Sequence, residues 1–128
     1  MIDHVSVEVR ALEASARFYD RVLGALGYAR LVERERTVGF GKRYPELWLN
    51  LRPDMRPVAR GCGAHVCLRA GTTAEVDAFH AAALALDGAD DGRPGPRDHD
   101  DPARIYYAAF IRDPDGNRIE AVTFAPRA

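Results

Sequence analysis

The sequence contains little cysteine, and this scarcity excludes several kinds of protein. Cys62 and Cys67 are separated by four residues, which is the spacing neither of a usual zinc pair nor of a thioredoxin-like pair. Two cysteines in 128 residues cannot build the disulfide framework of a small secreted domain. We therefore expect reduced thiols. The chain is long enough to bury a hydrophobic core without disulfide bonds.

Excess charge of one sign and long apolar runs are also missing. The 18 Lys and Arg residues nearly balance the 19 Asp and Glu residues, so no net field would attract nucleic acid or an anionic membrane. No stretch approaches the roughly 18 apolar residues of a membrane span, and the residues after Met1 do not have the pattern of a signal peptide. We expect a cytoplasmic protein whose partner is a small molecule, with no nucleic acid and no membrane.

The chain does contain an internal repeat. The pattern of Ile2–Val9 recurs as Gly63–Ala70, and each stretch alternates like a strand, carries one histidine and precedes a helix pattern. The two histidines, His4 and His65, are about half a chain length apart, which indicates a duplicated unit. A pseudo-two-fold axis would bring these histidines together.

Turn residues, mainly proline and glycine, divide the sequence into segments. We predict one domain of two modules, over about 1–52 and 63–126, which are joined by a connector over about 53–62. Each module is predicted to contain a strand, a helix and three strands. The first module has strands at 2–9, 31–35, 37–41 and 47–51 and a helix at 12–23. The second has strands at 63–70, 89–92, 105–112 and 117–124, a helix at 73–87, and a loop at 93–103.

The repeat and the closing stretch Asp113–Glu120 resemble the vicinal oxygen chelate superfamily, the group of glyoxalases, bleomycin resistance proteins and extradiol dioxygenases. Phe18-Tyr19 and Leu23-Gly24 match the first helix of that family and its exit. The resemblance covers nearly the whole chain. It implies an α+β fold in which two tandem βαβββ modules form a curved mixed sheet cup with the helices outside, and it implies a homodimer.

The resemblance also implies that His4, His65 and Glu120 are metal ligands. Two imidazoles and one carboxylate suit one divalent ion, such as Fe, Mn, Zn, Ni or Co, and leave coordination positions open. A substrate with two adjacent oxygens could chelate there, and the ion would act as a Lewis acid. The turn Asp113–Gly116 fixes the register of the last hairpin and thereby decides where Glu120 points.

A second carboxylate could act beside Glu120 in catalysis. Glu46, Trp48 and Asn50 share one face of their strand by alternation. Glu46 is the carboxylate among them, and it is either a ligand or base, as in glyoxalases, or a solvated turn residue. Trp48 and Asn50 are predicted to line the substrate pocket.

Further candidates follow the two histidines and precede the final hairpin. Glu8 and Arg69 each lie four residues after a histidine. Both could bind a polar substrate, with Arg69 predicted to line the substrate pocket, or they are ion-paired or solvated residues at the rim. Of Tyr106 and Tyr107, one should face the cup, and Tyr107 is the predicted pocket residue. His99 lies in the acidic loop as a candidate acid or base on a mobile lid.

These observations favour a metal-dependent enzyme that acts on a small molecule with vicinal oxygens, by isomerase, lyase or oxygenase chemistry. The alternative is a metal-free small-molecule binding protein of the bleomycin resistance type, in which other residues commonly occupy the metal-ligand positions. The presence of His4, His65 and Glu120 together argues against that alternative.

Overall fold

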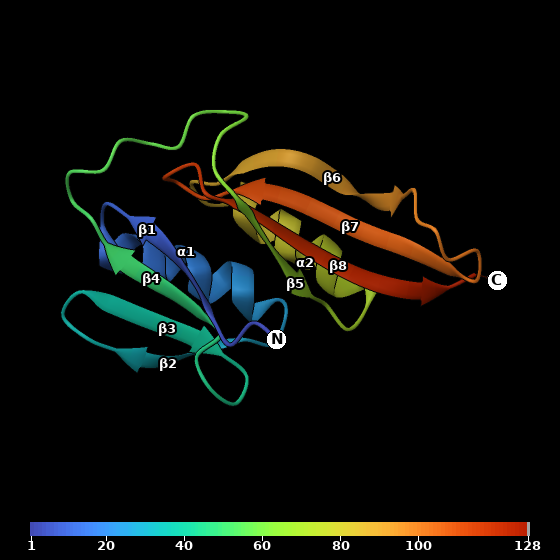
Figure 1. Cartoon of the computed structure of the whole chain (residues 1–128), viewed down its shortest axis with the longest axis horizontal. Coiled ribbons are helices and arrows are strands. Elements are labelled where there is room, and N and C mark those ends of the chain that lie inside the picture. The colour runs from blue at the N-terminus through green and yellow to red at the C-terminus, as the bar shows by residue number, and fades with distance from the viewer. Residues whose placement is uncertain (128) are drawn as a thin grey trace.

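The computed structural model describes residues 1–127 and has the duplicated architecture that the repeat predicts (Figure 1). Each module contains one strand, one helix and three further strands. The elements of the first module are β1 (Val5–Val9), α1 (Leu12–Gly24), β2 (Ala29–Glu33), β3 (Thr37–Gly41) and β4 (Leu47–Leu51). Those of the second are β5 (His65–Arg69), α2 (Thr73–Leu84), β6 (Ala89–Arg97), β7 (Arg104–Arg112) and β8 (Arg118–Pro126).

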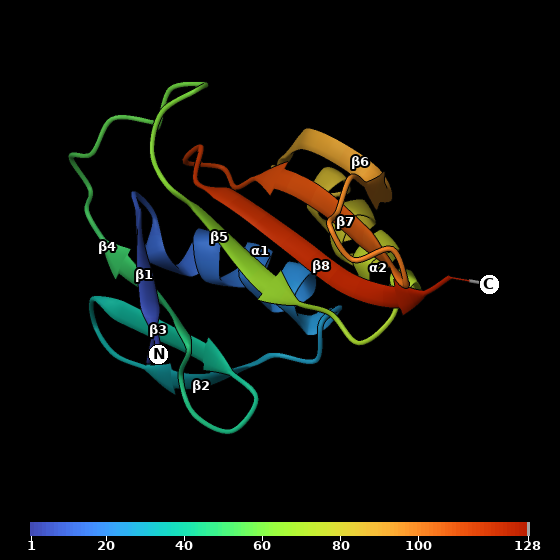
Figure 2. The same cartoon turned by 45° about the vertical axis from the view of Figure 1, so that its right-hand side comes forward.

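The strands form two four-stranded mixed sheets of matching order, β1-β4-β3-β2 and β5-β8-β7-β6. In each sheet the first strand lies parallel to the last strand of its module, and the other pairs are antiparallel. Both helices lie behind the sheets, so the opposite face is left open (Figures 1 and 2). The α+β prediction of two βαβββ modules with helices outside is confirmed.

The helices begin and end close to the predicted residues. In α1, Phe18 and Val22 are buried on the predicted apolar stripe. At the start of α2, the Thr72 hydroxyl accepts a hydrogen bond from the Glu75 amide at 3.1 Å, as its capping-box spacing predicts. Helix α2 ends at Leu84, three residues before the predicted end at 87, and a turn then leads into β6.

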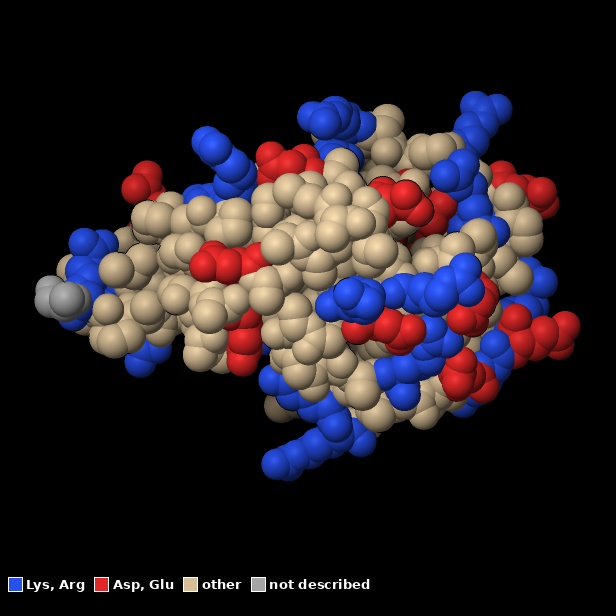
Figure 3. Space-filling model, turned by 180° about the vertical axis from the view of Figure 1, so that it is seen from behind, with Lys and Arg blue, Asp and Glu red and all other residues tan. Residues whose placement is uncertain are grey.

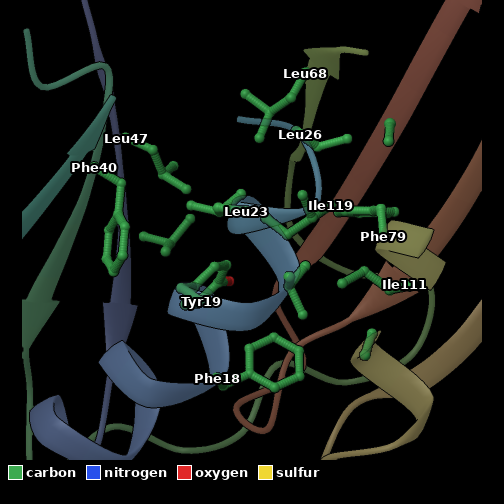
Figure 4. Close-up of a cluster of buried hydrophobic side chains, with 14 of the residues drawn as sticks. Phe18, Tyr19, Leu23, Leu26, Phe40, Leu47, Leu68, Phe79, Ile111 and Ile119 are labelled. Atoms are coloured by element: carbon green, nitrogen blue, oxygen red, sulfur yellow. The ribbon is translucent and has the colours of Figure 1, made fainter. Parts of the chain in front are cut away.

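The two modules share one hydrophobic core between the helices and the covered faces of the sheets (Figure 4). Tyr19 and Leu23 of α1 are fully buried in the same cluster as Phe79 of α2 and Ile119 of β8. The modules are therefore joined by apolar burial as well as by the connector.

The predicted loop over 93–103 is wrong in its first part, because residues 93–97 belong to strand β6. The prolines Pro94 and Pro96 and the surrounding glycines indicate a loop, yet β6 continues to Arg97 and pairs with β7. The reason is that β6 is the outermost strand, where a proline costs no hydrogen bond on the side that faces solvent. Its register shifts at Gly92, which has a φ of 153° and no room for a side chain, because a Cβ would lie 2.8 Å from Phe110.

Side chains in and next to the turn Asp113–Gly116 form hydrogen bonds that join the second module to the first. The hydroxyl of Tyr19 donates to Asp113 Oδ2 at 2.7 Å, and both side chains are buried. Arg10 Nε donates to Asp115 Oδ1 at 2.7 Å, and Asn117 Nδ2 donates to the Glu8 carbonyl at 2.8 Å. The turn thus fixes the relative position of the two sheets, a role that its sequence pattern did not indicate.

The face seen from behind carries basic and acidic side chains next to one another (Figure 3). Within the described chain, the guanidinium of Arg30 contacts three carboxylates, those of Asp20, Glu13 and Glu33. No helix within residues 1–127 is long and apolar enough to cross a membrane.

Candidate functional site

Two of the predicted metal ligands meet on the open face of the second module. Cys67 of β5 pairs in register with Glu120 of β8, and His65 lies two residues before Cys67 on the same face. His65 Nε2 lies 3.0 Å from Glu120 Oε2. Glu120 is 3% exposed and His65 is 45% exposed, so the carboxylate lies at the bottom of the site and the imidazole at its surface.

Tyr106 completes the surroundings of Glu120. Its hydroxyl donates a hydrogen bond to Glu120 Oε1, the oxygen that does not face His65. Burial and the neighbouring Glu120 carboxylate raise the pKa of Tyr106, so the phenol stays protonated and remains a donor near neutral pH. Burial and the same carboxylate also raise the pKa of Cys67 to about 12, which keeps its thiol protonated. Glu120 therefore has a fixed orientation.

The third predicted ligand, His4, lies just before β1 in the other module. Its Nδ1 is 2.6 Å from Asp3 Oδ2, which leaves Nε2 as the ring nitrogen for other partners. A groove of about 290 Å³ runs between the starts of β1 and β5, and His4, Glu46 and His65 all line it. The fold thus brings both repeat histidines and Glu46 to one groove, with Glu120 in contact with His65.

The donor types in this groove fit a divalent cation. Imidazole and carboxylate groups bind the first-row divalent metals and zinc, and the carboxylate that orients His4 is a common partner of a metal-binding histidine. Across residues 1–127, however, no three His, Cys, Asp or Glu side chains lie close enough together to hold a metal ion. The structure therefore assembles one pair, His65 and Glu120, and places His4 and Glu46 beside it.

The open face of the first module carries the other predicted pocket residues. Trp48 and Asn50 lie on the face of β4 that is turned away from the helices, and they line a hollow together with His4. The guanidinium carbon of Arg34 lies 5.2 Å from the centroid of the Trp48 ring. Glu8, on the same face of β1, contacts Arg52 at 3.2 Å and is thus a surface ion-pair residue.

The open face of the second module is lined by aromatic side chains. The guanidinium of Arg69 stacks on Phe124 at 4.6 Å, so Arg69 lies on this face as predicted from alternation. The ring of His99 lies 5.2 Å from that of Phe124 and 5.6 Å from that of Tyr106. His99 therefore borders the face that holds Glu120.

The placement of Tyr107 in the pocket is corrected by the structure. Tyr107 lies on the helix side of β7, where its hydroxyl donates to Asp77 of α2 at 2.8 Å. The register of β7 against β8 pairs Phe110 with Glu120 and Tyr106 with Phe124. The even-numbered residues of β7 consequently share the face of Glu120, and Tyr106 is the tyrosine beside it.

Comparison with known proteins agrees with the duplicated fold. The sequence profile of the glyoxalase/bleomycin resistance protein/dioxygenase superfamily matches residues 1–121. The chain belongs to this superfamily. The structure of a glyoxalase/bleomycin resistance protein from Albidiferax ferrireducens T118 is 32% identical, with a TM-score of 0.79 over 94% of this chain and 95% of that one. The comparison with curated proteins found no match.

More distant superfamily structures include enzymes with a named activity. Lactoylglutathione lyase from Agrobacterium tumefaciens is 26% identical, with a TM-score of 0.62 over 95% of this chain and 92% of that one. A glyoxalase I variant from Zea mays is 24% identical and has a TM-score of 0.69, over 93% of this chain and 44% of that one. The maize structure supports the fold alone.

For this superfamily member, the sequence analysis chose the wrong tyrosine of the Tyr106–Tyr107 pair and missed Arg34. Tyr106 could have been chosen over Tyr107 by counting the register outward from the turn at Asp113–Gly116, which places Phe110 opposite Glu120. Arg34 had no such signal, because it lies in the turn after β2 and its contact with Trp48 depends on how the strands are packed.

Proposed function

We propose that this superfamily member is a metal-dependent enzyme that acts on a small molecule with two adjacent oxygens, by isomerase or lyase chemistry. The observation that supports the proposal is the contact between His65 and Glu120 in a groove that is also lined by His4 and Glu46. Residues from both copies of the repeat converge there, as a duplicated ligand set requires.

His4, His65 and Glu120 would hold the divalent ion, which when bound would act as a Lewis acid toward the substrate oxygens. Tyr106 keeps Glu120 in one orientation through its hydrogen bond, and Asp3 orients His4. The open face above this groove admits a substrate from solvent.

Glu46 is proposed as the general base. Glu46 lies just before β4 and lines the groove beside His4. Its amide donates to the Phe40 carbonyl at 2.8 Å, and its carboxylate accepts a hydrogen bond from the Lys42 amide at 3.4 Å. A carboxylate at that position can take a proton from the carbon next to a substrate carbonyl. Base catalysis of this kind contributes about 10²- to 10⁴-fold to a rate.

Glu46→Gln should therefore abolish proton exchange without removing the metal. The test incubates metal-loaded protein in deuterium oxide with a panel of 2-hydroxy- and 2-oxo-carbonyl compounds and follows the carbon-bound proton by NMR. Glu35→Gln, an exposed carboxylate outside the groove, is the matched control. Exchange in Glu46→Gln at the parent rate would show that Glu46 is only a turn residue, and consumption of O2 with catechols and Fe(II) would favour the oxygenase class.

A metal-free binding protein is the second candidate function. It is favoured by the aromatic lining around Tyr106, Phe124 and His99 and by the absence, among the 127 described residues, of a preassembled three-ligand cluster. Binding of an aromatic compound with equal affinity before and after chelator treatment, together with no reaction across the panel, would support this candidate over the enzyme.

We also propose that the protein is a homodimer. The edge strands β1 and β5 each pair on one side only within their sheets, and Ile2 and Leu31 are large apolar side chains exposed near β1 and in β2. A second copy could cover such edges. Sedimentation at micromolar concentration should give about twice the 14.1 kDa mass of the chain. A mass of one chain would overturn the dimer and leave the metal proposal standing.

A further inference from the structure

A hollow of about 430 Å³ lies on the open face of the first module, and the proposed function does not account for it. His4 and Asp3 border it on the side of the proposed metal site. The rest of its lining includes one cation, one aromatic ring and three small polar groups, namely Arg34, Trp48, Ser6, Thr37 and Asn50. The volume is within the range of small-molecule sites.

The indole of Trp48 forms a wall of this hollow and is fixed by its neighbours. Trp48 lies between Ser6 of β1 and Gly39 of β3 in the sheet register. A Cβ at Gly39 would lie 3.0 Å from the Trp48 ring and 2.9 Å from Pro45, so the missing side chain at Gly39 makes room for the indole. The ring therefore presents a defined flat surface.

Arg34 supplies a positive charge that lacks a counter-ion. Its guanidinium stacks on the Trp48 ring at 5.2 Å, which holds it at the hollow. Within the described part of the chain, no carboxylate lies within ion-pair distance of Arg34. The carboxylate that borders the hollow, Asp3, is already bonded to His4 at 2.6 Å.

Thr37 supplies a buried hydroxyl that also lacks a partner. Its Oγ1 is buried and makes no hydrogen bond within residues 1–127. Because Thr37 pairs in register with Asn50, its hydroxyl and the carboxamide of Asn50 lie on neighbouring strands of the same sheet face. An unpaired buried hydroxyl is costly, so a rotation of the Thr37 side chain that lets a molecule in the hollow accept its hydrogen bond would be favourable.

We propose that this hollow binds a carboxylate of the substrate, which makes the substrate a small organic acid with a flat or apolar portion that lies against Trp48. The guanidinium of Arg34 matches the two oxygens of a carboxylate, and Thr37 and Asn50 add neutral donors. One arginine balances one negative charge, so a carboxylate fits better than a phosphate monoester, which carries nearly two. The inference rests on the proposed function, because His4 joins the hollow to the metal site.

The test uses metal-free protein, so that its outcome does not depend on the metal site. The probes are 3-phenylpropionate, its neutral amide and phenyl phosphate, none of which has vicinal carbonyl and hydroxyl oxygens. Trp48 is the single tryptophan of the chain, so its fluorescence reports binding at the hollow directly. Calorimetric titration gives the affinity independently, in case a variant alters the fluorescence itself.

We expect the carboxylate to bind more tightly than the amide, and Arg34→Gln to weaken its binding by about tenfold or more. Thr37→Val should weaken it less, and the exposed Arg43→Gln is the control that keeps parent affinity. Circular dichroism checks that each variant is folded. Equal affinity for acid and amide, tighter binding of phenyl phosphate, no binding by the parent, or equal affinity in Arg34→Gln and Arg43→Gln would each overturn the proposal. Loss of metal binding in His4→Ala is measured separately and tests only the proposed function.

Discussion

Replacing His65 or Glu120 with alanine should remove the metal and the activity together. Each change deletes one donor of the pair that the structure brings to 3.0 Å, and the remaining donors bind a divalent ion far more weakly. Changes to groups that merely orient a ligand already cost about 10- to 100-fold in metal affinity, so loss of a ligand should cost more. Elemental analysis of protein purified without added metal should give one equivalent in the parent and well below one in either variant.

Two further variants make this result specific to the ligand set. Tyr106→Phe removes only the hydrogen bond to Glu120 and should retain metal with reduced affinity. The exposed Glu35→Gln should retain a full equivalent. Full metal occupancy in His65→Ala or Glu120→Ala would show that the ligands lie elsewhere.

The fold could be predicted from the sequence wherever local rules decide it. Alternation in Val5, Val7 and Val9 fixed which face of β1 packs on the helices, and the open face of the same strand begins with His4. Short turns with proline and glycine separated the strands. The loop predicted over 93–103 was wrong over 93–97, because prolines disfavour a strand only where both edges are paired. The position of β6 at the sheet edge is a property of the whole fold.

Only the part of the site that depends on the repeat and on the strand faces could be predicted from the sequence. His65 and Glu120 lie on neighbouring parallel strands of one module, so their meeting follows from faces and register. The position of His4 relative to that pair depends on how the two modules pack. That packing is set by contacts over about a hundred residues of sequence, such as Tyr19 with Asp113, which no local pattern specifies.

The junction between the modules provides the other large effect, because Asp113→Ala should lower the free energy of unfolding by about 3–5 kcal/mol. Asp113 accepts hydrogen bonds from the amides of Asp115 and Asn117, from Asn117 Nδ2 and from the buried Tyr19 hydroxyl. Removing the carboxylate leaves these donors unpaired in the core between the modules. Urea unfolding at neutral pH measures the loss, with the exposed Asp54→Ala as the control that stays near the parent value.

Tyr19→Phe should cost less, about 1.5–3 kcal/mol, because Asp113 keeps its other donors when the hydroxyl is removed. If Asp113→Ala costs no more than Asp54→Ala, the turn does not join the modules and the shared apolar core alone holds them together.

The pH dependence of stability separates burial from hydrogen bonding at Asp113. Burial raises the pKa of its carboxyl above the ordinary value of 3.8, although hydrogen bonds from Asn117 and Tyr19 oppose the rise. Between the ordinary and the raised pKa, the folded chain holds a proton that the unfolded chain has released, so this contribution to stability falls as pH rises. Asp113→Asn cannot ionise and lacks the contribution. The unfolding free energy of the parent minus that of Asp113→Asn should therefore fall as pH rises above about 4, with a slope of at most about 1.4 kcal/mol per pH unit. A difference that grows with pH would mean that the hydrogen-bond donors outweigh burial and hold the carboxylate ionised.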